Sequence, residues 1–313
     1  MKKEAPRYMG GQAVMEGVMM RGLDRWAVAV RNLDGEVEVE VHDTPHWTEK
    51  WVHVPLVRGV ITLAESLNLG FKALAWSADR QLPEEERISS KAMGWTMAIA
   101  MVFFLAVFLV LPALGTSALG DWLDVHGFEY HLLEGGIRMA IFLGYLGLIG
   151  LIPDIKRVFM YHGAEHKAIA AYENNVELTP ESAQRFTTEH VRCGTNFLLT
   201  VMVVTIFVYS FVGRPALPLL VLSRIVLIPL VAGIAYEVIR YAARHMDKGW
   251  VRFLMKPGLA LQKLTTREPT LDQLEIAITS LKAVMTAEQL AEVEARPKAA
   301  IPATSSRPTF SPA

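Results

Sequence analysis

The residues best suited to chemistry lie in the segment 161–167, which reads Tyr-His-Gly-Ala-Glu-His-Lys. His162 and His166 are four residues apart, so on a helix they project from one face and can bind one metal ion. Glu165 lies beside them, where it can act as a general base toward a water held by the metal. This His-x-x-Glu-His order is that of the inverted zincins. Glu173 falls on the same helical face and is a candidate third metal ligand, or a partner that orients a ligand.

A second polar cluster occupies residues 189–196 and contributes His190 and Cys193, which are three residues apart. Together with His162 and His166 they would make a tetrahedral set of four, which is typical of a closed structural zinc site. If only three of the four bind, one coordination position stays open and catalysis becomes possible.

Other interpretations of these residues remain open. Cys193 near a helix N-terminus could be a thiolate nucleophile, with His190 as its base. It could equally be a small buried hydrophobe, with Thr195 or Asn196 as the helix N-cap. Two histidines four residues apart also occur by chance in helices that bind no metal.

A third motif, at residues 10–22, reads Gly-Gly-Gln-Ala-Val-Met-Glu-Gly-Val-Met-Met-Arg-Gly. Its four glycines indicate a backbone that turns tightly or approaches another group closely. It is not a P-loop, because it lacks the Gly-Lys-Ser/Thr ending. Glu16 and Arg21 could reach the histidine cluster or pair with each other.

The composition determines the class of protein that must position these residues. The chain has 313 residues, is 52% hydrophobic and carries a net charge of −1, so nothing in the balance favours nucleic acid as a partner. Cys193 is the single cysteine, which excludes an internal disulfide. The first ten residues are polar and predict no cleavable signal peptide.

Apolar residues are gathered in four blocks with few charges, at about 93–114, 136–152, 197–212 and 216–239. Because roughly 20 apolar residues in a helix cross a bilayer core of about 30 Å, we predict a mainly α polytopic membrane protein with four transmembrane helices. Only residues 213–215 separate the last two blocks, as in a tight helical hairpin.

The Lys/Arg asymmetry of the connections predicts the orientation. The connection between the first two blocks is acidic and has no Lys or Arg before Arg138, so we place it outside. The connection at 154–196, which carries the His/Cys cluster, and the segment after the fourth block are rich in Lys and Arg. We therefore expect a multi-pass protein of the inner (cytoplasmic) membrane, with both termini and the His/Cys loop in the cytoplasm.

The segments outside the membrane have soluble character. In the region 1–90, alternating polarity at 26–31 and 36–41 around Asp34-Gly35 predicts a β-hairpin, and residues 58–80 have the period of an amphipathic helix. The four-helix region would then span 91–256. Residues 257–296 predict a cytoplasmic amphipathic helix that begins near Leu271, and the Pro/Ser-rich residues 297–313 predict a disordered tail.

Three ionisable residues, Arg138, Arg224 and Glu237, fall within or at the ends of the predicted spans. Such groups are costly in a membrane and indicate either pairing or function. A structural Arg–Glu pair and a transport pathway are both compatible with them.

Taken together, the motifs at 10–22, 161–167 and 192–197, with the segment Gly258–Pro269, resemble one family. This is the YqhQ-like group of bacterial and plastid membrane proteins, a family of unknown function, and the resemblance covers roughly residues 8–285. It implies a membrane protein that is often described as a predicted metal-dependent enzyme, with no settled substrate.

The leading hypothesis is an integral membrane metalloprotein with a cytoplasmic hydrolytic site. His162 and His166 would bind a divalent metal, most readily zinc, with His190 or Cys193 as a further ligand and Glu165 as the base. One alternative is a non-catalytic membrane factor or scaffold that assists other membrane proteins. Another is a small transporter that uses Arg224 and Glu237 and needs oligomerisation. Membrane lipid is a partner in each case.

Overall fold

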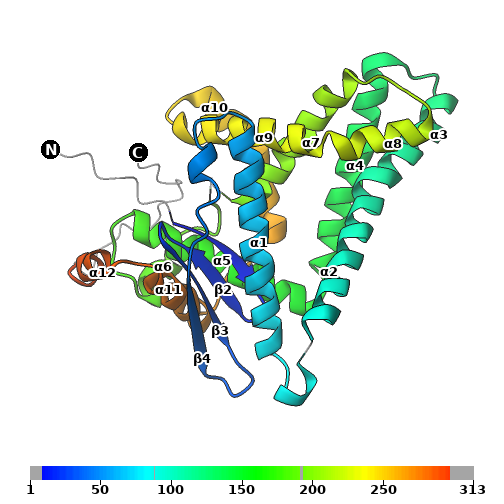
Figure 1. The fold of residues 1–313 in the computed structure, drawn as a ribbon. Helices are drawn as coiled ribbons and strands as arrows, with labels where there is room; N and C mark the ends of the chain where they lie inside the picture. Colours follow the sequence, from blue (N-terminus) through cyan, green and yellow to red (C-terminus); the bar gives the residue numbers. More distant parts are fainter. Residues whose placement is uncertain (1–8, 88, 191–192, 297–313) are drawn as a thin grey trace.

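The computed structural model describes residues 9–87, 89–190 and 193–296. It is mainly helical, with one antiparallel sheet near the N-terminus (Figure 1). Its strands pair in the order β1-β2-β3-β4: β1 (Gly10–Val14), β2 (Gly17–Arg21), β3 (Arg25–Arg31) and β4 (Val37–Asp43). The predicted hairpin around Asp34-Gly35 is confirmed as β3–β4, with Gly35 at φ +84° in its turn. The glycine-rich motif forms the other hairpin, β1–β2, which the sequence analysis did not assign to strands.

The remaining elements are helices. Those before residue 150 are η1 (Glu49–Trp51), α1 (Val57–Arg80), η2 (Glu84–Glu86), α2 (Ser90–Leu105), the π-helical turn η3 (Ala106–Val110), α3 (Leu111–Trp122) and α4 (Gly127–Ile149). Those after it are α5 (Pro153–Glu173), α6 (Pro180–Gln184), α7 (Gly194–Ser210), α8 (Leu217–Val226), α9 (Ile228–Arg244), α10 (Gly249–Thr265), α11 (Leu271–Ala283) and α12 (Ala287–Glu294).

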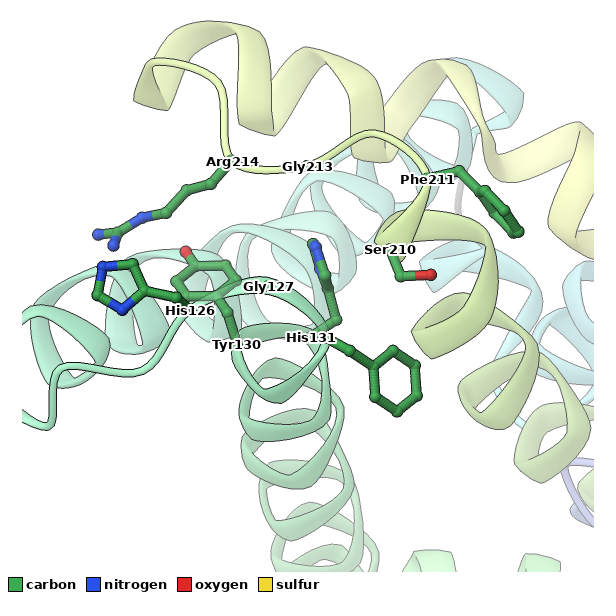
Figure 2. A pocket seen from close by; sticks show the side chains of 9 residues that line it. His126, Gly127, Tyr130, His131, Ser210, Phe211, Gly213 and Arg214 are labelled. Carbon is green, nitrogen blue, oxygen red and sulfur yellow. The ribbon is translucent and has the colours of Figure 1, made fainter.

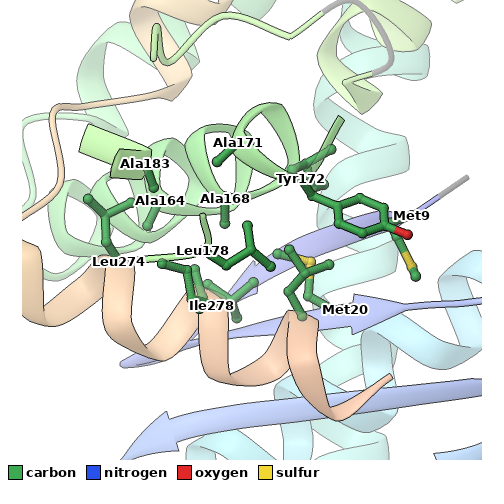
Figure 3. Packing of buried hydrophobic residues seen from close by; sticks show 14 of the residues in the cluster. Met9, Met20, Ala164, Ala168, Ala171, Tyr172, Leu178, Ala183, Leu274 and Ile278 are labelled. Atoms are coloured by element: carbon green, nitrogen blue, oxygen red, sulfur yellow. The ribbon is translucent and has the colours of Figure 1, made fainter. Parts of the chain in front are cut away.

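The sheet is covered on both faces. Ala27 and Ala29 of β3 point toward a core shared with α5 and α11, while Val28 and Val30 point toward α1. Figure 3 shows the first of these cores, where the small side chains of Ala164 and its neighbours on α5 face leucine and isoleucine of α11. Both faces of β3 are buried, so the alternating polarity from which the hairpin was predicted does not give this strand an exposed face. It holds for β4, where alternate side chains are more exposed.

Helix α1 confirms the predicted amphipathic helix and joins the sheet to the rest of the molecule. Its Leu69 packs against the sheet. Near its start Gly59 lies directly against Tyr236 of α9, and Arg58 pairs with Glu237. One helix therefore packs on the hairpin sheet at one end and on the apolar helices at the other.

The apolar helices only partly match the four predicted blocks. Two helical stretches are long and apolar enough to cross a membrane, Lys91–Trp122 and Gly127–Ile149. A third crossing follows if α8 and α9, which meet at an angle of 44°, count as one broken span, and α7 is a shorter apolar helix. The predicted second block, 136–152, is too short at its start, because the helix that contains it, α4, begins at Gly127. Acidic residues that suggested a loop lie on the first turns of α4 instead.

The buried charges of this region have partners that the sequence did not reveal. Glu134, predicted to lie in an outer connection, is buried on α4 and accepts hydrogen bonds from Arg138 and Arg224. Glu237 pairs with Arg58 of α1. The two residues proposed to act together in transport, Arg224 and Glu237, thus belong to different ion pairs.

The C-terminal elements fold back on the sheet. The predicted helix near Leu271 is confirmed as α11, and Thr270 with Gln273 forms a capping box at its start. Its apolar side is fully buried against the sheet and α5, so α11 is a core helix rather than a surface one. The predicted disordered tail, 297–313, lies outside the described residues.

Candidate metal centre

The histidine motif lies on α5, which is a helix as the spacing requires. The predicted loop 154–196 is in fact largely α5 and the short α6. One side of α5 carries Ala164 and Ala168, whose small side chains let the helix pack closely on the sheet core. His162 and His166 lie one turn apart, with ring centroids 4.4 Å from each other. Packing of the alanine face therefore fixes where the histidine rings lie.

Three of the predicted ligands converge. One potential ligand atom from each of His162, His166 and Cys193 lies within 4.8 Å of the other two. The closest approach is between Nε2 of His162 and Sγ of Cys193, at 3.2 Å. Cys193 comes from the start of α7, 31 residues along the chain from His162. An imidazole–imidazole–thiol set of this size can hold one tetrahedral metal ion.

Backbone carbonyls hold the outer nitrogens of both rings. Nδ1 of His162 lies 2.8 Å from the carbonyl oxygen of Thr265, and Nδ1 of His166 lies 2.5 Å from that of Thr188. A carbonyl can only accept, so each Nδ1 must carry a proton, and in the neutral form of either ring the lone pair is on Nε2. Nε2 of His166 is buried and has no hydrogen-bond partner among the described residues. This is the arrangement in which metal-binding histidines are usually held.

Gly163 explains how Thr265 comes so close to α5. The linker after α10 lies against the helix, and the Arg267 amide donates to the Phe159 carbonyl at 2.9 Å. A Cβ on Gly163 would collide with the Arg267 carbonyl oxygen. The glycine that lowers helix propensity inside the motif is therefore required by the close approach of the segment that orients His162.

Cys193 is the N-cap residue of α7, whereas one interpretation of the sequence predicted Thr195 or Asn196 at that position. Burial raises the pKa of its thiol to about 11, against a weaker lowering effect of the Thr195 hydroxyl, 3.3 Å from Sγ. The imidazole hydrogen-bonded to Sγ is that of His162 rather than that of His190. The predicted nucleophile–base pair is therefore wrong. A bound cation would favour the thiolate instead.

His190 and Glu173 pair with each other outside the convergent set. Nε2 of His190 lies 3.4 Å from a carboxylate oxygen of Glu173. The backbone of His190 is fixed by two hydrogen bonds of 2.8 Å to the Gln262 side chain, and its ring centroid lies 5.6 Å from that of His166. Burial lowers the pKa of His190 to about 4 and also lowers that of His166, so both rings are neutral at pH 7. Three of the four predicted ligands therefore converge, and His190 lies outside that group.

Glu165 is buried on α5 next to strand β1. Its Cγ lies 2.8 Å from the position a Cβ would take on Gly11, and the Gly11 amide donates to its carboxylate. Burial raises the pKa of this carboxyl to about 7, although the nearby His162 and the Gly11 amide act in the opposite direction. A carboxyl that titrates near neutral pH can both take up and release a proton there.

The chain is similar to a known protein family and to a bacterial protein along most of its length. The family model described as "Protein of unknown function (DUF1385)" matches residues 54–287. The chain belongs to this family. The "Uncharacterized protein YqhQ" of Bacillus subtilis (strain 168) is 33% identical over 312 residues, which is 95% of this chain and 98% of the relative. No solved structure matches the chain significantly.

In this DUF1385 chain the glycine-rich motif forms one wall of the candidate site. Glu16, in the β1–β2 turn at φ +50°, pairs with Arg157 of α5 and accepts from the Tyr161 hydroxyl at 3.2 Å. Arg21 pairs with Glu65 of α1. Both predicted options for Glu16 and Arg21, a mutual pair or contact with the histidines, are therefore wrong. The motif holds β1 against α5, which places Gly11 over Glu165.

Lys167 does not disturb the charge balance of the site. Its buried ammonium group donates to the Gln184 carbonyl at 2.7 Å and to Glu268 at 2.5 Å. Sequence reasoning missed the orienting carbonyls of Thr265 and Thr188, since a backbone carbonyl has no residue-specific signal. What the geometry offers is three convergent ligand atoms, two oriented imidazoles and one adjacent carboxyl with a raised pKa.

Proposed function

We propose that this DUF1385 protein is an integral membrane metalloprotein that hydrolyses its substrate at the cytoplasmic face. One observation carries the proposal: carbonyls hold the Nδ1 atoms of His162 and His166, and one potential ligand atom of each ring lies within 4.8 Å of the other and of that of Cys193. Imidazoles with an oriented tautomer and converging ligand atoms are what a metal site requires.

Zinc is the metal that this donor set fits best. Two imidazoles and one thiolate suit a borderline-soft ion with tetrahedral preference. With His190 engaged by Glu173, the protein supplies three ligands, which is the number typical of catalytic rather than structural zinc sites. The fourth position would be available to water or substrate.

The chain's own residues then divide the work. A bound zinc would supply a water acidic enough to lose its proton near neutral pH. Glu165, with its pKa near 7, would take up that proton and return it to the leaving group. The Gly11 amide holds the Glu165 carboxylate in place. Amide or ester hydrolysis next to the membrane is the chemistry we infer.

For the membrane topology we propose four crossings with both termini in the cytoplasm. The α7–α8 connection lies beside the α3–α4 connection, because Arg214 donates to Asp121 at 2.5 Å. If that end is outside, α7 and the bent α8–α9 pair run between it and the side that carries Cys193. The Lys/Arg-rich segments at 154–196 and after α9 support a cytoplasmic assignment for the candidate site.

Cobalt substitution tests the proposal without knowledge of the substrate. The full-length protein, purified in detergent and stripped of metal, is titrated with Co²⁺ and followed by visible and near-ultraviolet absorption. We expect one equivalent to give tetrahedral d–d bands and a thiolate charge-transfer band, and acetohydroxamate to shift the d–d bands by entering the open position. Cys193→Ser should remove the charge-transfer band and weaken Co²⁺ binding, because it removes the thiolate ligand.

Glu165→Gln separates catalysis from binding. This variant should bind one equivalent of Co²⁺ with the wild-type spectrum, while the function of the protein in cells is lost. A tetrahedral spectrum that does not respond to acetohydroxamate would indicate a closed structural site. Absence of stoichiometric cobalt or zinc in the wild-type protein would refute the metalloprotein itself.

A further inference from the structure

A second site lies at the opposite end of the apolar helices. A pocket of about 330 Å³ is formed where α4 begins and the α7–α8 connection turns (Figure 2). Its walls are largely aromatic and its polar groups are neutral or basic, since no carboxylate lines it: His126, Gly127, Phe128, Tyr130, His131, Ser210, Phe211, Gly213 and Arg214.

His131 is, with Tyr130, one of the two buried polar side chains that line the pocket. It is only 3% exposed, and Figure 2 shows its ring rising from α4 toward the connection that carries Gly213. Its Nδ1 has no hydrogen-bond partner among the described residues; a carboxylate oxygen of Glu134 is nearest, at 3.9 Å. A buried imidazole left in this way indicates a missing partner.

Directly beneath His131 the molecule carries an excess positive charge. Arg138 and Arg224 both donate to Glu134 at 2.6 Å, and all three side chains are buried. Guanidinium groups stay charged, so two arginines and one carboxylate leave a net charge of +1. The Tyr209 ring, 4.1 Å from the Arg224 guanidinium, reduces but does not cancel this charge.

Nearby acids do not supply the missing charge. Asp121 is already bound to Arg214, and Asp124 lies 3.7 Å from His126, with both carboxylates exposed at the mouth. An uncompensated charge in an apolar interior is costly. An anion bound beside His131 would therefore be attracted strongly to the buried arginines.

The side chains that line the pocket indicate which kind of molecule bears the anionic group. Phe211 is 91% exposed and Phe128 47%, and both flank the pocket at the end of predicted membrane helices. Aromatic side chains at this level are typical of contact with lipid. A free inorganic ion makes no favourable contact with aromatic side chains, whereas an amphiphile fits both the charge and the apolar lining.

We propose that this pocket binds the anionic headgroup of a phospholipid, with the His131 imidazole as a hydrogen-bond donor and Phe128 and Phe211 against the start of the acyl chains. The site is independent of the candidate metal centre, and its test does not depend on metal.

The test measures lipid retained by the full-length protein in native mass spectrometry. Protein in neutral detergent is incubated with phosphatidylglycerol, with phosphatidylcholine, or with phosphatidylglycerol and excess inorganic phosphate. We expect phosphatidylglycerol to be retained about tenfold more than phosphatidylcholine, as a hydrogen bond to a charged group allows. Inorganic phosphate should not displace it.

Two variants locate the binding. His131→Leu removes the donor and Ser210→Phe fills the pocket without touching the buried charges, and each should abolish the preference for phosphatidylglycerol. His245→Leu, which changes a partly exposed histidine after α9 that does not line the pocket, is the matched control and should keep it. If His131→Leu does not fold, Ser210→Phe carries the test alone. Equal retention of the two lipids, displacement by phosphate, or wild-type preference in a folded Ser210→Phe protein would overturn the proposal.

Discussion

Two buried clusters of ionisable side chains lie in different parts of this molecule and are satisfied in different ways. Among the apolar helices, Glu134 binds both Arg138 and Arg224, which leaves the cluster with a net charge of +1. Beside the sheet, backbone carbonyls hold the Nδ1 atoms of His162 and His166, and Nε2 of His162 lies 3.2 Å from Sγ of Cys193. The first cluster is held together by opposite charges; the second is formed by neutral groups that share one focus.

The difference shows how burial can be used for structure or for binding. A charged cluster in an apolar surrounding needs counter-ions within the chain, because an unpaired ion there is expensive. A cluster of neutral imidazoles and a thiol can stay open at a smaller cost, and a cation is what would complete it. Variants that remove one group from each cluster should therefore fail differently.

The largest effect is expected for Glu134→Gln. This change leaves two buried guanidinium groups without their carboxylate, which should cost about 3–5 kcal/mol of stability. Thermal unfolding of the detergent-solubilised protein measures it. Glu129→Gln, on the first turn of the same helix but exposed, is the control and should change the unfolding midpoint little. Equal midpoints for the two variants would mean that the buried charges contribute no net stability.

His166→Ala should have the opposite profile. The protein should stay folded, because the alanine face of α5 and α11 builds the core, but stoichiometric metal should disappear because one of three ligands is gone. Metal analysis by mass spectrometry and the unfolding midpoint are measured on one preparation. An exposed histidine, changed as His53→Ala, should leave both values unchanged. Retention of one metal equivalent by His166→Ala would refute the three-ligand site.

The sequence predicted these two clusters unequally well. The histidine spacing on a helix was readable, because 3.6 residues per turn places His162 and His166 on one face. The third group, Cys193, could be nominated but not chosen over His190, since their spacing suits ligation equally and only tertiary packing sends His190 to Glu173. The sequence indicated that Arg224 needs a partner but not which residue that is. Glu134 was assigned to a loop, because the first turns of α4 contain acidic residues and do not look like part of a membrane helix.

Fold features followed the same division. Periodicity identified the β3–β4 hairpin, α1 and α11, each of which has a local signal. It did not identify the β1–β2 hairpin, whose turn uses Glu16 at positive φ rather than the glycine or asparagine that such turns favour. Span boundaries were shifted wherever a helix continues beyond its apolar part, as α4 does at Gly127.

A smaller effect is expected from Gly163→Ala, which acts on the orienting carbonyl rather than on a ligand. The added methyl group must push the Arg267 carbonyl away and, with it, the linker that holds the Thr265 oxygen on His162. Loss of such an outer partner typically lowers metal affinity about 10–100-fold. Competition with a chelator of known affinity measures this change.

The control for Gly163→Ala is Gly144→Ala on α4, a helical glycine with no other atom close to the position of the added Cβ. It makes the same change in helix propensity and should leave metal affinity untouched. If both variants bind metal like the wild-type protein, the linker is not what orients His162.

The smallest effect is expected at His190, and it is the one that decides between the two possible metal sites. In a closed site His190 would be the fourth ligand, so His190→Gln should weaken binding as strongly as Cys193→Ser. In the open site its ring belongs to Glu173, which a glutamine amide can still reach as a donor, and the backbone bonds to Gln262 are kept. We therefore expect His190→Gln to keep one equivalent of Co²⁺, the wild-type spectrum and the response to acetohydroxamate. Loss of the metal from this variant would show that His190 leaves Glu173 and becomes the fourth ligand, so that the candidate metal centre is closed.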